Sequence, residues 1–210
     1  NAIFFRGVNQ EEMLFAAQRG VYRAFWEQGL GVDFISTRNL TQEILKKYRV
    51  VCLPMFGLMS NELADELETF VVNGGILIGF ARCATLSDTG WYHHQLPIRG
   101  LRAVFGIQTA HAGNLDAKTI QFNGHTFNGY LNRDHLTPHP DAEILAHFSD
   151  GLPAVILNSH GKGVGVYLAT QADSGNLRPQ GDLLSHVSRE IFRRKGIQPK
   201  MGFTENIPRA

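Results

Sequence analysis

The sequence predicts an α/β protein with a doubly wound, mostly parallel sheet, helices on both of its faces, and an antiparallel β extension. Three observations indicate this class. Short apolar runs alternate with segments of helical period in the first half of the chain, closely spaced β-type runs follow, and a last amphipathic segment comes after them. Because parallel strands need crossover connections, which are right-handed and commonly helical, the alternation implies that helices cover the sheet on both sides.

Four short apolar runs form the parallel part of the predicted sheet. They are rich in aromatic and β-branched residues and cover residues 2–5, 32–35, 50–53 and 76–80. Runs of this length and composition are typical of strands. Joined by helices, they give a parallel sheet whose strands are buried on both faces.

Helical segments are expected between these runs and near the end of the chain. The first begins at Asn9, which forms a capping box with a glutamate three residues later, and ends at Gly29. Ser60 can cap the second, and Gly74 can supply a left-handed residue at its end. A third is expected after Asp182, with basic residues that complement its negative end.

The pattern becomes β-rich after about Gly106. Residues 119–122 and 125–130 flank Asn123 and Gly124, a dipeptide that favours a two-residue type I′ hairpin turn. Further β-type runs cover residues 142–148, 153–157 and 164–169. We therefore expect an antiparallel extension of the sheet in this part of the chain.

Composition and charge argue against two classes of partner. Twenty basic residues against nineteen acidic ones leave a net charge of +1, with no long basic run, so nucleic acid is not expected to bind. The apolar runs fall far short of the roughly 20 residues of a membrane span. We expect a soluble protein with no membrane contact, and a hydrophobic content of 43% is enough for one sizeable core.

The cysteines and the start of the sequence bear on the cellular compartment. Cys52 and Cys83 lie in or just after apolar runs and are too few for a disulfide framework. From Asn1 onward no charged segment precedes an apolar one, so no secretory signal is identified. A cytoplasmic, reducing location is the expectation.

Several landmarks of the sequence, taken in order, resemble a known family. They are apolar strand segments and glycine-containing turns at residues 32–35, 50–54, 70–78, 96–101, 105–107, 161–163 and 167–170. Together they are similar to the middle domain of glycoside hydrolase family 42 β-galactosidases over nearly the whole chain. Residues 196–199 and 206–208 resemble the passage from that domain into a small C-terminal β domain. We therefore expect one domain over residues 1–197 and a linker over residues 198–210.

The resemblance implies a fold like that of the class I glutamine amidotransferases, with a flavodoxin-like sheet. In the family this domain follows a catalytic (β/α)₈ barrel and helps the subunits form a homotrimer, so the implied partners are other copies and the protein's own barrel domain. The hydrolytic carboxylates of the family belong to the barrel, which typically needs about 250 residues. The implied role is that of a non-catalytic oligomerisation domain in carbohydrate metabolism, with no catalytic residue, cofactor or metal of its own.

Cys83 is the basis of an alternative hypothesis, a stand-alone amidotransferase-like hydrolase. The residue follows a predicted strand, near the place where enzymes of the implied fold carry a nucleophile elbow. Such an elbow needs small neighbours, however, and no glycine flanks Cys83. The late histidines that could act as its base, His160 or His186 with Glu190, do not resemble the His-Pro-Glu of amidotransferases. An incidental thiol is the favoured interpretation.

Metal and phosphate sites find little support in the sequence. His135 and His139 would converge on one ion only in a helix, and prolines on both sides of His139 favour extended backbone. The acidic residues within 62–68 share the solvent face of a helix and do not form a pair across a sugar-sized cleft. Residues 161–163 lack the order of a phosphate-binding loop and indicate a hairpin turn.

A long irregular segment, residues 82–100, is the candidate interaction site. It starts at the carboxyl end of a predicted strand, where open α/β sheets place their sites, and loops of this length are commonly functional. Arginine and aromatic residues are enriched at protein interfaces. We expect a subunit contact, or the rim of a neighbouring barrel's sugar cleft, to be formed by Arg82, Trp91, Tyr92, His93 and His94.

Two other interpretations of this segment stay open. The loop could pack over the edge of its own sheet and have no external role. Alternatively, the chain could be a sugar-binding accessory domain, in which Trp91 or Trp26 stacks on a pyranose. Because Trp26 follows Phe25 on the first predicted helix, we expect its side chain in the core.

Overall fold

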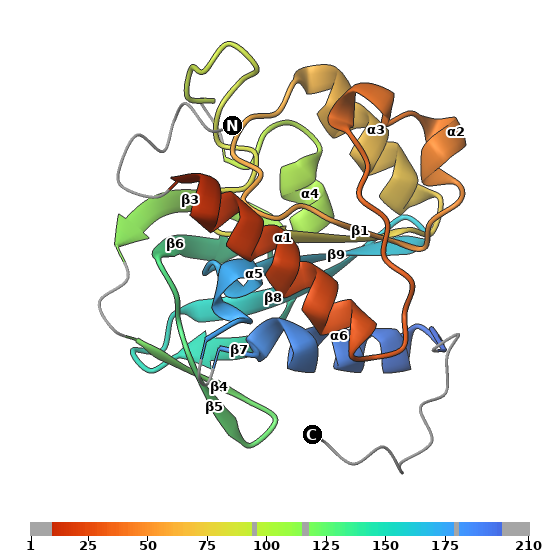
Figure 1. Cartoon of the computed structure of the whole chain (residues 1–210). Helices are drawn as coiled ribbons and strands as arrows, with labels where there is room; N and C mark the ends of the chain where they lie inside the picture. The colour runs from red at the N-terminus through yellow and green to blue at the C-terminus, as the bar shows by residue number, and fades with distance from the viewer. Residues whose placement is uncertain (1–9, 94–95, 115–117, 179–180, 199–210) are drawn as a thin grey trace.

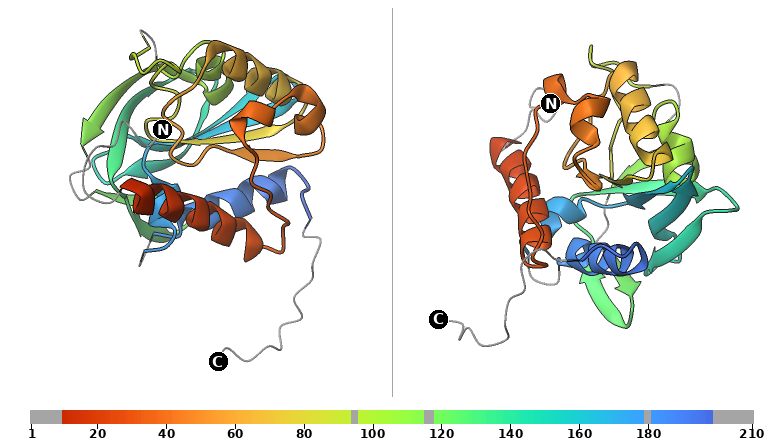
Figure 2. Two further views of the ribbon diagram at one scale, coloured as in Figure 1. Left: turned by 45° about the horizontal axis from the view of Figure 1, so that its top comes forward. Right: turned by 90° about the vertical axis from the view of Figure 1, so that its right-hand side faces the viewer.

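The computed structural model describes residues 10–93, 96–114, 118–178 and 181–198 of the chain. Two sheets and seven helical segments make up these residues. The helical segments are α1 (Gln10–Trp26), η2 (Thr37–Asn39), α2 (Gln42–Leu45), α3 (Asn61–Val72), α4 (Leu101–Phe105), α5 (Ala172–Gly175) and α6 (Leu183–Arg194). Helices α3 and α4 lie on one side of the larger sheet and α6 on the other, so the expected cover on both faces is confirmed (Figures 1 and 2). None of the described helices is long and apolar enough to cross a bilayer.

The larger sheet has seven strands in the order β1-β2-β9-β8-β7-β4-β5. They are β1 (Val50–Cys52), β2 (Ile76–Phe80), β9 (Gly163–Leu168), β8 (Pro153–His160), β7 (Glu143–Phe148), β4 (Thr119–Phe122) and β5 (His125–Asn128). β1, β2 and β9 run parallel, and every other pairing is antiparallel. The sheet is therefore mixed. The prediction of a mostly parallel sheet is wrong for the described strands, because β8, β7, β4 and β5 continue the same sheet beyond β9 with antiparallel pairings.

The antiparallel extension is confirmed by the described strands. Asn123 and Gly124 both have positive φ values, 47° and 78°, as a type I′ turn between β4 and β5 requires. Gly161, at φ 59°, lies in the turn between β8 and β9, as expected of a hairpin. These tight turns force neighbouring strands to run antiparallel.

Residues 32–35 do not form the predicted strand. They are irregular, and Phe34 is 63% exposed, with its ring stacked on Tyr22 at a centroid distance of 6.3 Å. Tyr48 Oη donates to Asp33 Oδ2 at 3.0 Å from the neighbouring segment. A β-type run becomes a strand only when a partner strand accepts its hydrogen bonds, and the described part of β1 pairs with β2 alone. The strand predicted at residues 2–5 lies outside the described residues.

Local signals predicted the helices well. Ser60 Oγ accepts a hydrogen bond from Leu63 N at 3.2 Å, and Gly74, at φ 111°, follows the end of α3. Asp182 stands at the N-cap of α6 but its side chain makes no capping bond, because its carboxylate lies 3.3 Å from Nε2 of His186. The cap expected at Asn9 lies outside the described residues.

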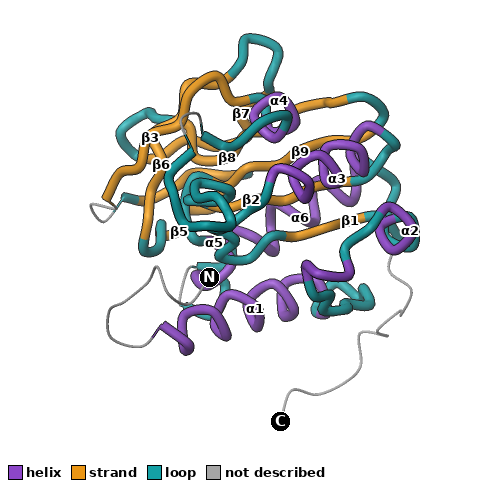
Figure 3. The backbone as a smooth tube through the Cα atoms, turned by 90° about the horizontal axis from the view of Figure 1, so that it is seen from above, coloured by secondary structure: helices purple, strands orange, loops and turns teal. Residues whose placement is uncertain are grey.

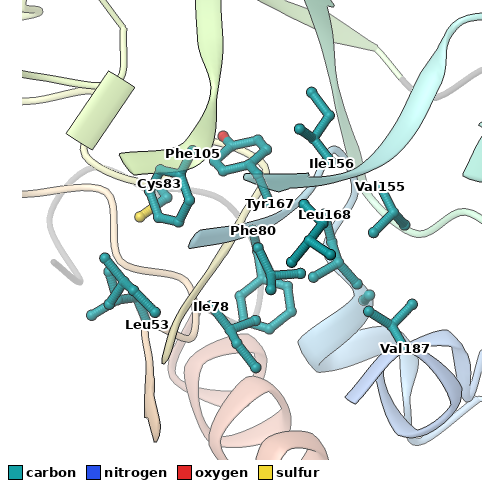
Figure 4. Packing of buried hydrophobic residues seen from close by; sticks show 14 of the residues in the cluster. Leu53, Ile78, Phe80, Cys83, Phe105, Val155, Ile156, Tyr167, Leu168 and Val187 are labelled. Atoms are coloured by element: carbon teal, nitrogen blue, oxygen red, sulfur yellow. The ribbon is translucent and has the colours of Figure 1, made fainter. Parts of the chain in front are cut away.

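The core is densest where β2 and β9 lie side by side. Every residue of both strands is buried, and the Phe105 and Tyr167 rings meet edge to face at 5.2 Å (Figure 4). Gly165 permits α4 to contact β9 directly, because a Cβ there would lie 2.2 Å from the carbonyl oxygen of Val104. The close approach of α4 buries the central strand β9 on that face of the sheet.

A two-stranded antiparallel ribbon, absent from the sequence-based prediction, lies beside the carboxyl ends of β2 and β9. It consists of β3 (Ile107–Asn114) and β6 (Asn132–Pro138), seen at the left of Figure 3. Asp134 N donates to Ala169 O at 3.0 Å, which ties the ribbon to the chain after β9. The buried Arg133 forms two hydrogen bonds with Asp150, at 2.7 and 3.1 Å. The ribbon also contacts the start of the segment 82–100, because Arg82 N donates to Asp134 Oδ2 at 2.8 Å and Arg82 Nη2 donates to Gly113 O at 3.2 Å.

Candidate functional site

The segment 82–100 starts in a constrained turn directly after β2. Arg82 and Ala84 have φ values of 66° and 54°, a conformation that costs a non-glycine residue of order 1–3 kcal/mol. Two hydrogen bonds hold the turn in place. Arg82 N donates to Asp134 Oδ2 at 2.8 Å, and Gln171 Nε2 donates to Ala81 O at 2.6 Å. The start of the loop is thus held by side chains from two other parts of the chain.

Asp134 is the centre of this support. Its side chain is buried, Oδ2 also accepts a hydrogen bond from Tyr167 Oη at 2.6 Å, and Oδ1 lies 3.5 Å from Arg82 Nε. Burial raises the pKa of Asp134, while the bonds from Tyr167 and Arg82 act in the opposite direction. Burial, together with the Asp134 carboxylate, raises the pKa of Tyr167 well above its ordinary value. One carboxylate therefore connects β6, β9 and the start of the loop.

Cys83 lies in the same turn, and its surroundings oppose nucleophilic chemistry. The side chain is 1% exposed and packs in the core near Phe105 and Tyr167 (Figure 4). Burial raises the pKa of the thiol far above its usual range, and the Asp134 carboxylate raises it further. A nucleophilic cysteine needs the opposite, a lowered pKa and an accessible sulfur.

The histidines considered as a base for Cys83 are engaged elsewhere. His160 pairs with Gly163 at the amino end of β9, the opposite edge of the sheet from the end of β2, and its Nε2 lies 3.2 Å from Glu68 Oε1. His186 contacts Asp182 and packs its ring on the rings of His125 and Phe127, at 4.8 and 4.9 Å. The structure thus does not bring either histidine to the thiol.

Beyond the turn, the loop lies along residues 56–59. Ala84 N donates to Phe56 O at 2.8 Å, and Met59 N donates to Leu86 O at 2.8 Å. Leu86 forms isolated β-bridges with both Leu58 and Tyr92. Leu86 is therefore held by backbone pairing on both of its sides.

The tip of the loop presents two aromatic side chains to solvent. Ser87 N donates to Trp91 O at 2.8 Å, and Trp91 N donates back to Ser87 Oγ at 3.1 Å, which closes the tip. Trp91 is 78% exposed and Tyr92 is 71% exposed. Tryptophan and tyrosine are among the residues enriched at the energetic centres of protein interfaces.

The five residues predicted for this site separate into different roles. Trp91 and Tyr92 share the exposed tip, whereas Arg82 lies at the loop start with Asp134. His93 belongs to the loop's own bonding, because its N donates to Thr85 O at 3.0 Å and its ring Nε2 lies 3.4 Å from Met59 O. His94 lies outside the described residues.

A second group of exposed aromatic residues was not predicted from the sequence. Phe15, Tyr22 and Trp26 are 57%, 40% and 44% exposed, and their spacing of seven and four residues places them on one face of α1. The expectation that Trp26 lies in the core is wrong, because helical spacing directs Phe25 inward and its neighbour outward. This spacing was the signal that could have identified the face.

Within the described ranges, no three histidine, cysteine or acidic side chains converge as metal ligands. His135 lies in β6 opposite His111, while His139 follows the strand, with its Nδ1 3.5 Å from an Asp141 carboxylate oxygen. The two predicted candidates therefore make separate local contacts.

The family model and the sequence relatives that this chain matches agree on one family. The family model described as "Beta-galactosidase trimerisation domain" matches residues 10–198. The β-galactosidase BgaB of a Geobacillus strain is 28% identical over 193 residues, which cover 89% of this chain and 27% of BgaB. The β-galactosidase LacZ of Heyndrickxia coagulans is 26% identical over 86% of this chain and 26% of its own length. The chain thus spans about a quarter of the length of these relatives.

Solved structures share the fold. A catalytic mutant of Gan42B, a GH42 β-galactosidase from G. stearothermophilus, superposes with a TM-score of 0.78 at 21% identity, over 94% of this chain and 28% of Gan42B. The cytoplasmic protein STM3548 from Salmonella typhimurium superposes with a TM-score of 0.59 at 11% identity, over 81% of this chain and 85% of STM3548. The same fold therefore occurs both within a longer hydrolase and in a chain of similar size.

Proposed function

The chain belongs to the family of GH42 β-galactosidase trimerisation domains, and from this premise we propose that it is a non-catalytic oligomerisation domain that joins copies of its parent protein into a homotrimer. The family match over residues 10–198 carries the proposal. The burial of Cys83 supports the non-catalytic role, since the thiol is inaccessible. The domain extends over residues 1–197, with residues 198–210 as a linker to the next domain.

The proposal assigns glycoside hydrolysis to a separate catalytic barrel of the parent protein, which is the second partner of this domain. The relatives that span about four times the length of the match are named β-galactosidases, which supports a parent of that class. The proposed location is the cytoplasm, in keeping with the two free thiols, Cys52 and Cys83.

Within this role, the loop tip with Trp91 and Tyr92 is the proposed contact with a neighbouring subunit or with the rim of its sugar cleft. The support from Asp134 holds the loop start in one conformation, so little conformational entropy is lost when the tip binds. Aromatic side chains on such loops dominate the energy of many interfaces. A cyclic trimer uses two different patches on each subunit, and the tip is proposed as one of them.

Sedimentation of the parent protein over a concentration series tests the proposed function. The wild-type protein is expected to sediment as a trimer, and Trp91→Ala to dissociate at higher concentrations than the wild type. Glu27→Ala, which breaks an exposed ion pair with Arg23 of α1, serves as a matched surface control. It is expected to leave the trimer and its dissociation concentration unchanged. A parent protein that stays monomeric at every concentration would refute the assembly role.

A sugar-binding accessory domain is a second candidate, favoured by the 78% exposure of Trp91. An exposed indole ring can stack on a pyranose face. Titration of galactose and lactose against tryptophan fluorescence separates this function from assembly. A saturable change that is lost in Trp91→Ala supports sugar binding, whereas a concentration-dependent trimer without such a change supports the oligomerisation role.

A further inference from the structure

The outer side of α1 carries a stripe of aromatic side chains around one arginine. The stripe consists of Phe15, Arg19, Tyr22 and Trp26. Their spacings of four, three and four residues place them on one side of the helix, and all four are exposed. At 1.5 Å per residue the stripe is about 17 Å long. It is therefore long enough to form part of a protein interface.

Phe34, from the segment that follows α1, extends this stripe. Its ring stacks on Tyr22 at a centroid distance of 6.3 Å and an interplanar angle of 18°. The inner side of α1 is anchored to the core, where the rings of Phe25 and Phe192 of α6 meet at 5.6 Å. Four aromatic rings are thus presented to solvent by a helix that is fixed in place. We call this surface the α1 face, and it consists of Phe15, Arg19, Tyr22, Trp26 and Phe34.

The exposed aromatic side chains form two separate groups. Within the part of the chain that the structure describes, six aromatic side chains are exposed by 40% or more. Four belong to the α1 face, and the other two are Trp91 and Tyr92 at the loop tip. In Figures 1 and 2, α1 and the yellow-green loop lie on different sides of the molecule. A cyclic trimer needs two such patches, because each contact joins one patch to the other patch of the next subunit.

The two groups carry opposite charges. Arg19 lies in the middle of the α1 face, and Asp88 lies at the loop tip, where the hydroxyls of Ser87 and Thr89 bond to each other at 2.8 Å. Both charged side chains are exposed, and neither forms an ion pair or a hydrogen bond with another described residue. Opposite charges favour contact between the two groups, whereas like charges disfavour contact of either group with a second copy of itself. The charges therefore favour a head-to-tail arrangement.

We propose that the α1 face binds the loop tip of a second copy of this chain, with Arg19 paired to Asp88 of that copy. The aromatic rings of the tip pack on those of the α1 face, and three such contacts close a ring. The inference rests on the proposed homotrimer and names the second patch that this assembly needs. Glu27, the control position above, is turned by about 100° from Trp26 around the helix and lies outside the α1 face.

Exchange of the two charges tests the proposal by sedimentation of the parent protein. Arg19→Glu and Asp88→Arg are each expected to raise the concentration at which the trimer dissociates by about ten-fold or more, because each places two like charges in the contact. The double variant re-forms the pair in reverse and is expected to return to within about three-fold of the wild type. Single variants that leave the trimer unchanged, or a double variant no better than the single ones, would overturn the proposal.

Lys162→Glu is the matched control for Arg19→Glu. It makes the same change in net charge at an exposed position of the turn between β8 and β9, and it is expected to leave the trimer unchanged. A wild-type parent that forms no trimer would refute the proposed function and this inference with it. A trimer weakened by Trp91→Ala but not by Arg19→Glu would keep the proposed function and overturn the inference alone. An Arg19→Glu variant with a lower melting temperature and an unchanged trimer would show that the α1 face packs within its own subunit, which also contradicts the inference.

Crosslinking gives a second test that does not require a weakened trimer. The parent protein that carries both Arg19→Cys and Asp88→Cys is treated with a short bismaleimide reagent and compared with the wild type. Covalent trimers are expected from the double variant, and neither single variant should give crosslinked chains beyond those of the wild type. Covalent dimers from Arg19→Cys alone would show that two α1 faces meet each other. That result, or a double variant without crosslinked chains, contradicts the proposal.

Discussion

Replacing Asp134 separates the contribution of its hydrogen bonds from that of its charge. In Asp134→Ala, Tyr167 Oη and Arg82 N both lose their acceptor, and the Arg82 guanidinium loses its counter-charge. A buried donor without a partner costs about 1–3 kcal/mol. Two such donors and a partly buried unpaired charge give an expected loss of roughly 3–5 kcal/mol in the free energy of unfolding. That is a large share of the 5–15 kcal/mol typical of a domain.

Asp134→Asn is expected to cost less, about 1–2 kcal/mol. The amide oxygen can accept both hydrogen bonds at the position of Oδ2, whereas the amide NH₂ takes the place of Oδ1 and replaces the attraction to Arg82 Nε with a contact between two donors. Urea denaturation followed by circular dichroism gives the three free energies. Asp65→Ala, which breaks a half-exposed pair with Arg99, is the control and is expected to cost less than about 1 kcal/mol. If Asp134→Ala cost no more than that control, the central role assigned to this carboxylate would be wrong.

Three further predictions follow from the same contacts. Trp91→Ala is expected to cost about 2 kcal/mol or more of association energy but less than about 0.5 kcal/mol of domain stability, measured by sedimentation and by a matched thermal melt. Cys83 should react slowly with an alkylating reagent at neutral pH in the folded chain and quickly after unfolding. The substitution Cys83→Ser should leave the function of the parent protein unchanged. Rapid labelling of the native protein would revive the nucleophile hypothesis. Burial raises the pKa of Asp173 from 3.8 to about 6, so the stability that its protonated form contributes at low pH is lost as the pH rises through this range, by up to roughly 3 kcal/mol. Denaturation from pH 4 to pH 7 should show that Asp173→Asn lacks this decline, and parallel pH profiles for both proteins would refute the assignment.

The sequence predicted those elements whose determinants are local. α3 is an example, because Ser60 at its start and Gly74 after its end act within a few residues of the helix itself. The turn at Asn123 and Gly124 is another, since both residues adopt the positive φ that the dipeptide favours. Strand order depends on distant partners instead. Nothing within residues 164–169 indicates that they pair with β2, and a β-type composition at residues 32–35 was not sufficient without a partner.

In the candidate site, too, the features with local determinants were predicted and those that depend on distant partners were missed. The composition of residues 82–100 predicted an interaction site. Trp91 and Tyr92 are exposed there, while the role of the segment in assembly stays a prediction. Asp134 was missed because β6 carries two adjacent charged residues near its start, a pattern typical of a solvated loop. Its ribbon pairing and its bonds to Tyr167 and Arg82 arise only in the folded chain. A charged pair next to a β-type run was the one signal that could have identified it.

The pairing of β2 with β9 bears on how the protein is made. Ile76 aligns with Val164, so the two central strands are separated by about 90 residues of chain. A ribosome adds roughly 5–20 residues per second, and β2 therefore waits about 4–18 s for its neighbour. During that interval the backbone edge of residues 76–80 on that side has no strand to pair with. Synthesis rate and chaperone supply should consequently limit the yield of folded protein more strongly than the stability of the finished domain does.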